Sequence, residues 1–381
     1  MNKITQSKFT IVSNGYADGP SQALRDFFLN HKAASVTTIE HPLVAGGDNV
    51  HVTNFYKNKS VTTKRVNILN KPPNTYVFDL FIPLRIPSDE TVWFGFNNLA
   101  CLRGLLRRKL GRNQKVVYWA VDFVPNRFGN GIATKVYNAV DRFVCKHADM
   151  RVELTQEALE QRAEYLNLTA NVAARSMVVP MGAWLARTPK VSANAFQKKK
   201  IVYMGHIVER QGVTNLIKAL AILTKKDKDV TLDIVGGGPD EEKMKLLANE
   251  LGLTNKITFR GFVEDHKDVE AYLAEGTVAV APYAKVPDNF SVTSDPGKIK
   301  AYLGASLPIV LTDVPPIAKV LKSHGAALLP DDTPESIAKA ISEYLYDKKA
   351  WASAHNASAK LAKDYDWESI LSTKLINIDL K

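Results

Sequence analysis

Short apolar runs alternate with amphipathic segments along both halves of the chain. In the first half, six apolar runs predict strands. They cover residues 9–13, 36–40, 76–81, 91–94, 116–121 and 177–180. Helical spacing appears between several of them, as in residues 21–31 and 132–146. Because strands and helices alternate, we predict a parallel sheet with crossover helices.

This alternation breaks at residues 183–200, which end in a run of lysines, and we interpret this stretch as a linker between domains. The alternation then restarts. Predicted strands cover residues 201–204, 231–235, 257–261, 278–282 and 308–312, and predicted helices cover 213–224, 241–251, 268–274 and 296–305. Beyond Pro334 the pattern is helical. We therefore predict two doubly wound α/β domains with a ligand cleft between them.

Composition supports a packed protein of two domains, with 381 residues of which 45% are hydrophobic and 23% charged. The sequence contains no apolar stretch of 18 residues and opens directly into a predicted strand, so we expect neither a spanning helix nor a signal peptide. Cys101 and Cys145 have no paired spacing, which argues against a disulfide framework or a cysteine zinc site. We expect a cytoplasmic protein.

The net charge of +11 indicates an anionic partner. Its densest cluster lies on a predicted amphipathic helix and comprises Arg103, Arg107, Arg108, Lys109 and Arg112, with leucines between them. Two interpretations stay open, a solvated face over a buried leucine stripe and a surface for anionic phospholipids at the inner face of a membrane. No zinc spacing or aromatic-rich basic strand accompanies the cluster, so we expect no nucleic acid.

Three glycine-containing segments follow predicted strands or begin predicted helices. In residues 234–239, IVGGGP, the glycines allow backbone amides to approach an anion, although a tight turn explains them equally well. A dinucleotide fingerprint would need a glycine where Glu241 stands. In residues 204–212, MGHIVERQG, a loop rich in donors suits a diphosphate.

The third segment, residues 294–308, predicts a helix with Asp295 as its N-cap and Pro296 at its first position. Lys298 falls in the first turn, where a cation is unfavourable with the helix dipole. This placement suggests an anionic ligand that both the amine and the helix face, with an ordinary solvated lysine as the alternative.

Taken in order, these segments resemble the donor domain of retaining GT-B glycosyltransferases of family four (group 1), in the subgroup with a Pro-x-Lys-x-x-x-Tyr-Leu helix. The resemblance spans residues 201–367 and rests on MGHIVERQGVTNLIKAL, LDIVGGGPDEEKMKLLANELGLTNKITFRGFV, DPGKIKAYLGASLPIV and DWESI. It implies an α/β fold of two Rossmann-like domains facing a cleft. The boundaries would be an acceptor-side domain 1–183, a linker 184–199, a donor domain 200–358, and a helix 359–381 returning to the first domain.

The resemblance also implies metal-independent transfer, with retention, from a nucleotide-diphosphate sugar to a glycan or lipid-linked acceptor. UDP is favoured over GDP on family habit alone, and the nucleotide sugar is a substrate, so no cofactor is expected. A nucleotide-sugar binding protein without turnover and a 2-epimerase stay open as alternatives.

The family's donor positions map onto particular residues of this chain. Arg210 and Lys298 would stabilise the leaving diphosphate, and His206 and Gln211 stand where the family carries cations. Further donor contacts are expected from Gly205, Gly238, Pro239, Phe262, Val263, Asp295, Pro296, Gly297 and Tyr302. No metal ligand is expected.

One departure concerns the family's Glu-x7-Glu pair, because no glutamate occurs between Glu275 and Glu335. Ala301 stands at the position of the ribose-binding glutamate, and Ser306 replaces a later glycine. We consider Asp295 and Asp288 as substitutes.

In the N-terminal half, Gly15 and Gly19 lie in a loop after the first strand that resembles the family's glycine loop beside the reacting sugar, although a plain turn is as good an explanation. Asp122 ends a later strand and is our candidate for touching the donor sugar, with a helix cap or a salt bridge to Arg127 as the alternative. We interpret His147 as a structural residue of its helix.

Overall fold

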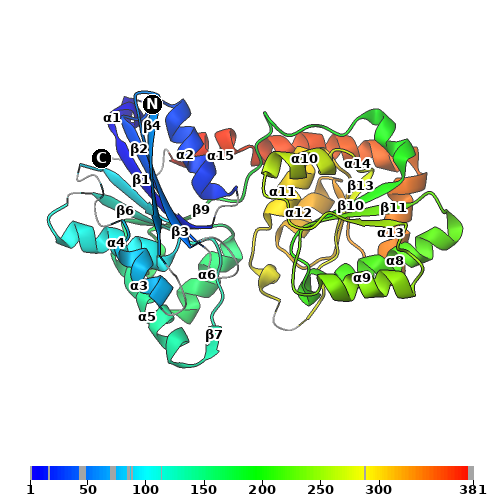
Figure 1. The fold of residues 1–381 in the computed structure, drawn as a ribbon, viewed down its shortest axis with the longest axis horizontal. Coiled ribbons are helices and arrows are strands. Elements are labelled where there is room, and N and C mark those ends of the chain that lie inside the picture. The colour runs from blue at the N-terminus through cyan, green and yellow to red at the C-terminus, as the bar shows by residue number, and fades with distance from the viewer. Residues whose placement is uncertain are drawn as a thin grey trace. The chain divides into compact units, whose positions relative to one another are not determined.

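The computed structural model describes residues 2–15, 18–42, 49–68, 74–83, 86, 89–112, 114–286 and 289–375. The chain divides into an N-terminal unit, Met1–Pro180 with Leu371–Lys381, and a C-terminal unit, Met181–Ile370 (Figure 1). Residues 184–199, which the sequence suggests as a linker, fall within the C-terminal unit and include the short helix η1 (Ala193–Lys198). Among the described residues, no helix is long and apolar enough to cross a membrane.

The N-terminal unit contains a sheet in the order β4-β3-β2-β1-β5-β6-β8-β9. Its strands are Lys8–Asn14 (β1), Ser35–His41 (β2), Val50–Lys57 (β3), Ser60–Asn67 (β4), Val92–Gly95 (β5), Lys115–Trp119 (β6), Met150–Glu153 (β8) and Ser176–Val178 (β9). The expected parallel pairing holds from β2 to β9, whereas β3 and β4 add an antiparallel hairpin at the edge. Every residue of β4 is exposed, so that strand carries no apolar alternation to predict it.

Helices connect these strands. They are Asn2–Gln6 (α1), Pro20–Asn30 (α2), Asn74–Phe81 (α3), Asn98–Lys109 (α4), Ile132–His147 (α5), Gln156–Tyr165 (α6) and Ala170–Ala173 (α7), with a short strand Arg127–Asn130 (β7) before α5. The strand predicted at residues 76–81 is wrong, because this segment lies in α3. A short apolar run does not distinguish a buried strand from a helix by periodicity.

The C-terminal unit has a fully parallel sheet in the order β12-β11-β10-β13-β14-β15. Its strands are Lys200–Met204 (β10), Thr231–Val235 (β11), Ile257–Phe259 (β12), Val278–Ala281 (β13), Ile309–Leu311 (β14) and Ala327–Leu328 (β15). Its helices are Val213–Lys226 (α8), Glu241–Glu250 (α9), His266–Leu273 (α10), Gly297–Gly304 (α11), Ile317–Ser323 (α12), Pro334–Tyr346 (α13), Lys348–Leu361 (α14) and Trp367–Lys374 (α15), with short helices η2 (Glu209–Gln211), η3 (Phe290–Val292) and η4 (Ala362–Tyr365). All five strands and four helices predicted between residues 201 and 312 are confirmed, with shifted ends.

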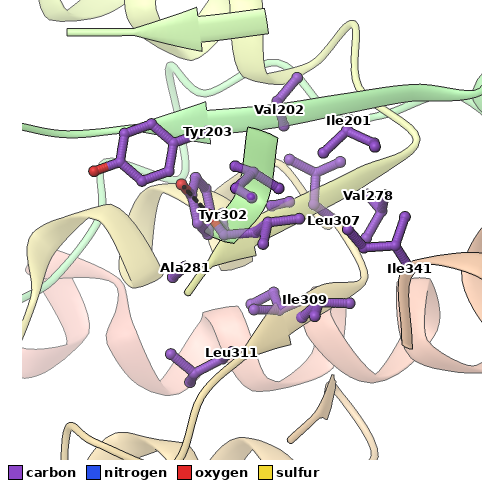
Figure 2. Packing of buried hydrophobic residues seen from close by; sticks show 14 of the residues in the cluster. Ile201, Val202, Tyr203, Val278, Ala281, Tyr302, Leu307, Ile309, Leu311 and Ile341 are labelled. Carbon is purple, nitrogen blue, oxygen red and sulfur yellow. Dashed lines mark hydrogen bonds between the residues drawn. The ribbon is translucent and has the colours of Figure 1, made fainter. Parts of the chain in front are cut away.

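The core of this unit joins α11 to the sheet (Figure 2). Tyr302 of α11 is fully buried. Its hydroxyl accepts a hydrogen bond from the backbone N–H of Met204 at 2.8 Å and donates one to the carbonyl of Val280 at 3.2 Å. Because both polar bonds are satisfied inside the core, Tyr302 fixes α11 against β10 and β13.

A buried ionic cluster holds the N-terminal unit together behind β6. Arg162 of α6 donates from Nε to Oε1 of Glu153 at 2.6 Å and also binds Asp141 of α5. It donates as well to the backbone carbonyl of Asp122 at 2.6 Å. All three ionic side chains are at most 1% exposed. The cluster thereby anchors the loop that follows β6.

The removal of this cation should be costly. Arg162→Ala removes the guanidinium from two buried carboxylates, of which Glu153 keeps Arg151 at 3.4 Å and Asp141 keeps the hydroxyl of Tyr118. We therefore expect the N-terminal unit to lose about 3 kcal/mol of unfolding free energy, the lower end of the cost of breaking a buried ion pair. Arg108→Ala is the matched control, because Arg108 pairs with Asp149 at the surface and its loss should cost about 0–1 kcal/mol. Urea unfolding followed by tryptophan fluorescence measures both variants. Equal losses would contradict the assigned role of Arg162.

Gly212 is the N-cap of α8 and has a φ of 71°, in the left-handed region that favours glycine. A Cβ at this position would lie 1.7 Å from the carbonyl oxygen of Pro282, which follows β13. Gly252, after α9, has φ of 68° but open space around its Cβ position. The two glycines therefore differ in steric contact and share their backbone conformation.

This contrast gives a matched pair of substitutions. Gly252→Ala should cost about 1 kcal/mol through backbone strain alone. Gly212→Ala should cost at least about 2 kcal/mol more, because the methyl group would have to separate α8 from the segment after β13. Urea unfolding of the C-terminal unit measures the difference, and equal costs would show that the close approach to Pro282 has no energetic weight.

Candidate functional site

Two strand-to-helix turns meet at the carboxyl ends of β10 and β11. The N–H of Gly205 donates to the carbonyl of Val235 at 2.9 Å. A Cβ on Gly236 would lie 2.1 Å from the oxygen of Gly205, and one on Gly238 would lie 2.3 Å from the oxygen of Ile207. The two turns thus pack backbone against backbone, and only glycine fits at these positions.

Three of the expected donor residues meet at the amine of Lys298. Its Nζ donates to Oε1 of Gln211 at 2.6 Å and to the hydroxyl of Tyr203 at 3.3 Å. A Cβ on Gly205 would lie 2.4 Å from this amine. Gly205 and Gln211, from one loop, and Lys298, 87 positions beyond Gln211, therefore form one cluster.

The electrostatics of this amine are unusual. It lies 4.5 Å from the centre of the Tyr203 ring and 5.2 Å from that of Tyr283. Desolvation by these neighbours lowers the pKa of Lys298 to about 7. No described residue places a carboxylate beside the amine to offset this effect. An anion that binds there would supply the missing charge.

The other predicted donor residues are less closely grouped. The Arg210 guanidinium lies 4.5 Å over the ring of Phe290, and its Nε has no hydrogen-bond partner among the described residues. No contact between Arg210 and Lys298 is found within the described part of the chain. His206 and Pro239 are exposed, Phe262 is 78% exposed, and Val263 is half-buried.

Helix α11 starts differently from the prediction. Pro296 is its N-cap and Gly297 its first residue, so the assignment of Asp295 as N-cap is wrong. Asp295 is buried, and its carboxylate binds the amine of Lys300 and accepts from the N–H of Met181 at 2.7 Å. The carboxylate of Asp295 is therefore satisfied by this ion pair and the N–H of Met181, and it does not cap α11.

These contacts bear on the missing glutamate pair. Asp295 already has its partners, and Ala301 is buried in the core. Asp288 lies outside the described residues. Tyr302, expected to contact the donor, is instead enclosed in the core with both of its hydrogen bonds satisfied.

The N-terminal unit contains a cavity of about 630 Å³ at the carboxyl ends of β1, β5 and β6. It is lined by residues 13–14, 19–22, 96–99, 120–122 and 127–128, together with Asp79, Tyr118 and Tyr137. Gly19 and Asp122, which we predict to lie beside the reacting sugar, line this cavity, whereas Gly15 is buried beside it with φ of 91°. Asp122 is paired with Arg127, which matches the salt-bridge alternative.

A smaller cavity, of about 240 Å³, lies in the C-terminal unit where α8 and α9 begin. Gly212, Asp240 and Lys243 line it, and none of the expected donor residues does. We therefore place the candidate donor site around Lys298, not in this cavity.

The basic helix α4 is not a uniformly solvated face. Arg103 is buried and donates to backbone carbonyls, among them that of Pro83 at 2.5 Å. Arg107 binds Glu90 at 2.5 Å and Arg108 binds Asp149 at 2.7 Å. Lys109 and Arg112 are exposed, so membrane contact stays a prediction that rests on these two. His147, as expected, is a structural residue, with its ring bonded to the carbonyl of Phe143.

Sequence reasoning missed Asn14 and Asp79 in the wall of the larger cavity. Asn14 Nδ2 donates to Oδ2 of Asp79 at 2.8 Å. Desolvation raises the pKa of Asp79 to about 6, although Asn14 and Arg103 act in the opposite direction. Asn14 could have been found, because it ends an apolar strand where sheet ligands commonly bind. Asp79 lay in the segment wrongly predicted as a strand.

The chain resembles known proteins over its C-terminal half. Residues 187–361 match the model of the family "Glycosyl transferases group 1". An uncharacterized glycosyltransferase of Haemophilus influenzae is 26% identical over 186 residues, which cover 48% of this chain and 50% of the relative. The lipopolysaccharide core biosynthesis glycosyltransferase LpsD of Rhizobium meliloti is 30% identical over 126 residues, or 33% of each chain. The matched region thus spans half or less of these relatives.

Solved structures match the fold over nearly the whole chain. Sucrose-phosphate synthase from Thermosynechococcus elongatus has a TM-score of 0.72 at 16% identity, covering 98% of this chain and 99% of the other. Anabaena HepE in complex with UDP has a TM-score of 0.66 at 13% identity, with the same coverage. Residues 187–361 are therefore similar to the glycosyl transferases group 1 family, and the chain as a whole has the α/β fold of GT-B glycosyltransferases.

Proposed function

We propose that this protein transfers a sugar from a UDP-sugar donor to a glycan or lipid-linked acceptor with retention of configuration. The observation that carries the proposal is the half-buried amine of Lys298, held between Gly205 and Gln211 without a carboxylate partner in the described chain. Desolvation destabilises the charged amine in the free protein, so a diphosphate bound at this turn would stabilise it strongly.

The chemistry follows from the charge that develops during transfer. When the bond from the sugar to the diphosphate breaks, negative charge grows on the leaving diphosphate and positive charge on the anomeric carbon. Lys298 and the first amides of α11 would stabilise the leaving group more in the transition state than in the ground state. Arg210 would need to turn from Phe290 to join them.

Two similarities support UDP as the nucleotide. Structures that share this fold include Anabaena HepE in complex with UDP-glucose and the pneumococcal O-GlcNAc transferase GtfA in complex with UDP and GlcNAc. The acceptor would enter the cavity of the N-terminal unit, where Asp122 faces the space available to a sugar. A nucleotide-sugar binding protein without turnover is the alternative, favoured by the absence of a glutamate at position 301.

The amine predicts how nucleotide affinity depends on pH. With its pKa lowered to about 7, Lys298 of the free protein is charged below that pH and neutral above it. UDP requires the charged form, so its Kd should rise by up to about tenfold per pH unit above pH 7, with proton uptake on binding. Between pH 7 and about pH 6, where the terminal phosphate of UDP begins to gain a proton, the Kd should be nearly flat. Isothermal titration calorimetry in two buffers of different ionisation enthalpy measures both effects.

The matched variants for this test are Lys298→Met and Lys218→Met. Lys298→Met should bind UDP more weakly at pH 7 and should lose the pH slope, whereas Lys218 is exposed on α8 and its substitution should change neither. A panel that includes GDP and ADP tests the choice of base. If the Lys298 variant binds UDP like the unmodified protein, the donor site is misplaced.

Turnover tests the role of Asp122 and the alternative function together. Asp122→Asn should lower sugar transfer about a hundredfold, because an anion that stabilises the cationic transition state is lost, while UDP affinity stays unchanged. Asp89→Asn is the control, since Asp89 lies at the surface paired with Lys8. Transfer to pooled glycan and lipid acceptors is measured by mass spectrometry. UDP-sugar binding with no transfer to any acceptor would favour the binding protein.

A further inference from the structure

Three side chains capable of binding a metal converge in the N-terminal unit. His41 ends β2, His51 follows the start of β3, and Asp79 belongs to α3. The antiparallel register pairs Glu40 with Val52, so its continuation places His41 opposite His51. Ten positions apart in the sequence, the two imidazoles thus meet on one face of the sheet, where α3 supplies the carboxylate.

The potential ligand atoms are close and buried. Nδ1 of His41 lies 2.8 Å from Nδ1 of His51 and 3.5 Å from Oδ1 of Asp79, and the distance from His51 to the same oxygen is 4.0 Å. The side chains of His41 and His51 are 1% exposed and that of Asp79 is 7% exposed. Two ligand atoms of a tetrahedral zinc ion are separated by about 3.3 Å, so an ion would require the two nitrogens to separate by about 0.5 Å and His51 to approach the carboxylate by about 0.7 Å.

The carboxylate is only half satisfied. Asn14 donates to Oδ2 of Asp79, whereas Oδ1 has no hydrogen-bond partner among the described residues. The nearby Arg103 guanidinium gives its N–H groups to backbone carbonyls instead. A buried carboxylate oxygen without a donor is costly, and a cation between it and the two imidazoles would remove this cost.

The kind of ligand selects the kind of ion. Two imidazole nitrogens and one carboxylate oxygen suit zinc and its neighbours in the first transition series, whereas calcium and magnesium prefer shells of oxygen. The bond from Asn14 would orient the carboxylate, as outer-shell partners of metal ligands do.

We propose that His41, His51 and Asp79 bind one divalent transition-metal ion of the zinc type, at the wall of the N-terminal cavity. The ion would join β2, β3 and α3 and would fix Asp79, which lines that cavity. Three protein ligands leave at least one coordination position for water or another oxygen. This site is separate from the donor chemistry at Lys298 and does not depend on it.

The test uses the untagged full chain, stripped with a chelator and titrated with Zn²⁺ against a chromophoric competitor. One ion per chain is expected, with a zinc-dependent rise in Tm. Co²⁺ should give the visible absorption of a low-coordinate site with nitrogen and oxygen ligands, which a hydrated surface ion lacks. This spectrum comes from the unmodified protein and needs no variant to fold.

Two ligand variants and one control locate the ion. Asp79→Asn and His51→Gln should each weaken zinc binding at least about tenfold and abolish the Co²⁺ spectrum. His147→Gln removes an exposed histidine of the same unit and should change neither. Circular dichroism without metal verifies that each variant folds.

The outcomes divide cleanly. Loss of binding in both ligand variants, with binding kept in the control, supports the site. If all variants bind zinc equally, the ion binds at another place. If the unmodified protein binds no zinc, the two histidines form only a hydrogen-bonded neutral pair. Either result overturns the proposal. UDP affinity, measured in parallel, is unaffected in every case, so a failure here is distinguishable from a failure at Lys298.

Discussion

The desolvation of one amine governs the candidate donor site. Lys298 approaches Gln211 and two tyrosine rings, and no described carboxylate offsets its charge. This arrangement is possible because Gly205 leaves room for the amine, where a Cβ would lie 2.4 Å away. The positions of Gly205, Gln211 and Lys298 thus depend on one another. The preference of this site for an anion follows from the neutral surroundings of the Lys298 amine more than from the number of cations in the site.

Two lysines of the same helix illustrate the point. Lys300 is buried as well, but the carboxylate of Asp295 binds it and the pair serves to hold α11 in place. Lys298, two positions earlier, lies on another side of the helix and, among the described residues, meets neutral groups alone. The two amines differ in charge balance because the fold gives them different partners. Nothing in the local sequence GKIK distinguishes them.

In the N-terminal unit, too, charged side chains that the sequence suggests are exposed prove to be buried. The arginines of α4 look like a solvated basic face, yet Arg103 is buried and satisfies carbonyls of the segment after α3, and Arg107 binds a buried glutamate. The long guanidinium donates several hydrogen bonds at once, which lets it enter an interior that a pattern of charges would exclude. The hairpin of β3 and β4 escaped prediction because its outer strand is exposed throughout.

The sequence by itself determined the alternation of strands and helices from residue 201 to residue 312. The strands of a parallel sheet are buried on both faces, so each one appears in the sequence as a continuous apolar run. It also indicated Gly205, Gln211 and Lys298, through glycine turns and a cation at a helix start. Only the tertiary structure decided that Tyr302 and Asp295 serve the core, and that His41 and His51 meet beside Asp79. The contacts of Tyr302 with Met204, of Asp295 with Met181 and of the histidines with Asp79 join residues far apart in the chain. Strand register and helix packing determine these contacts, and no local pattern encodes them.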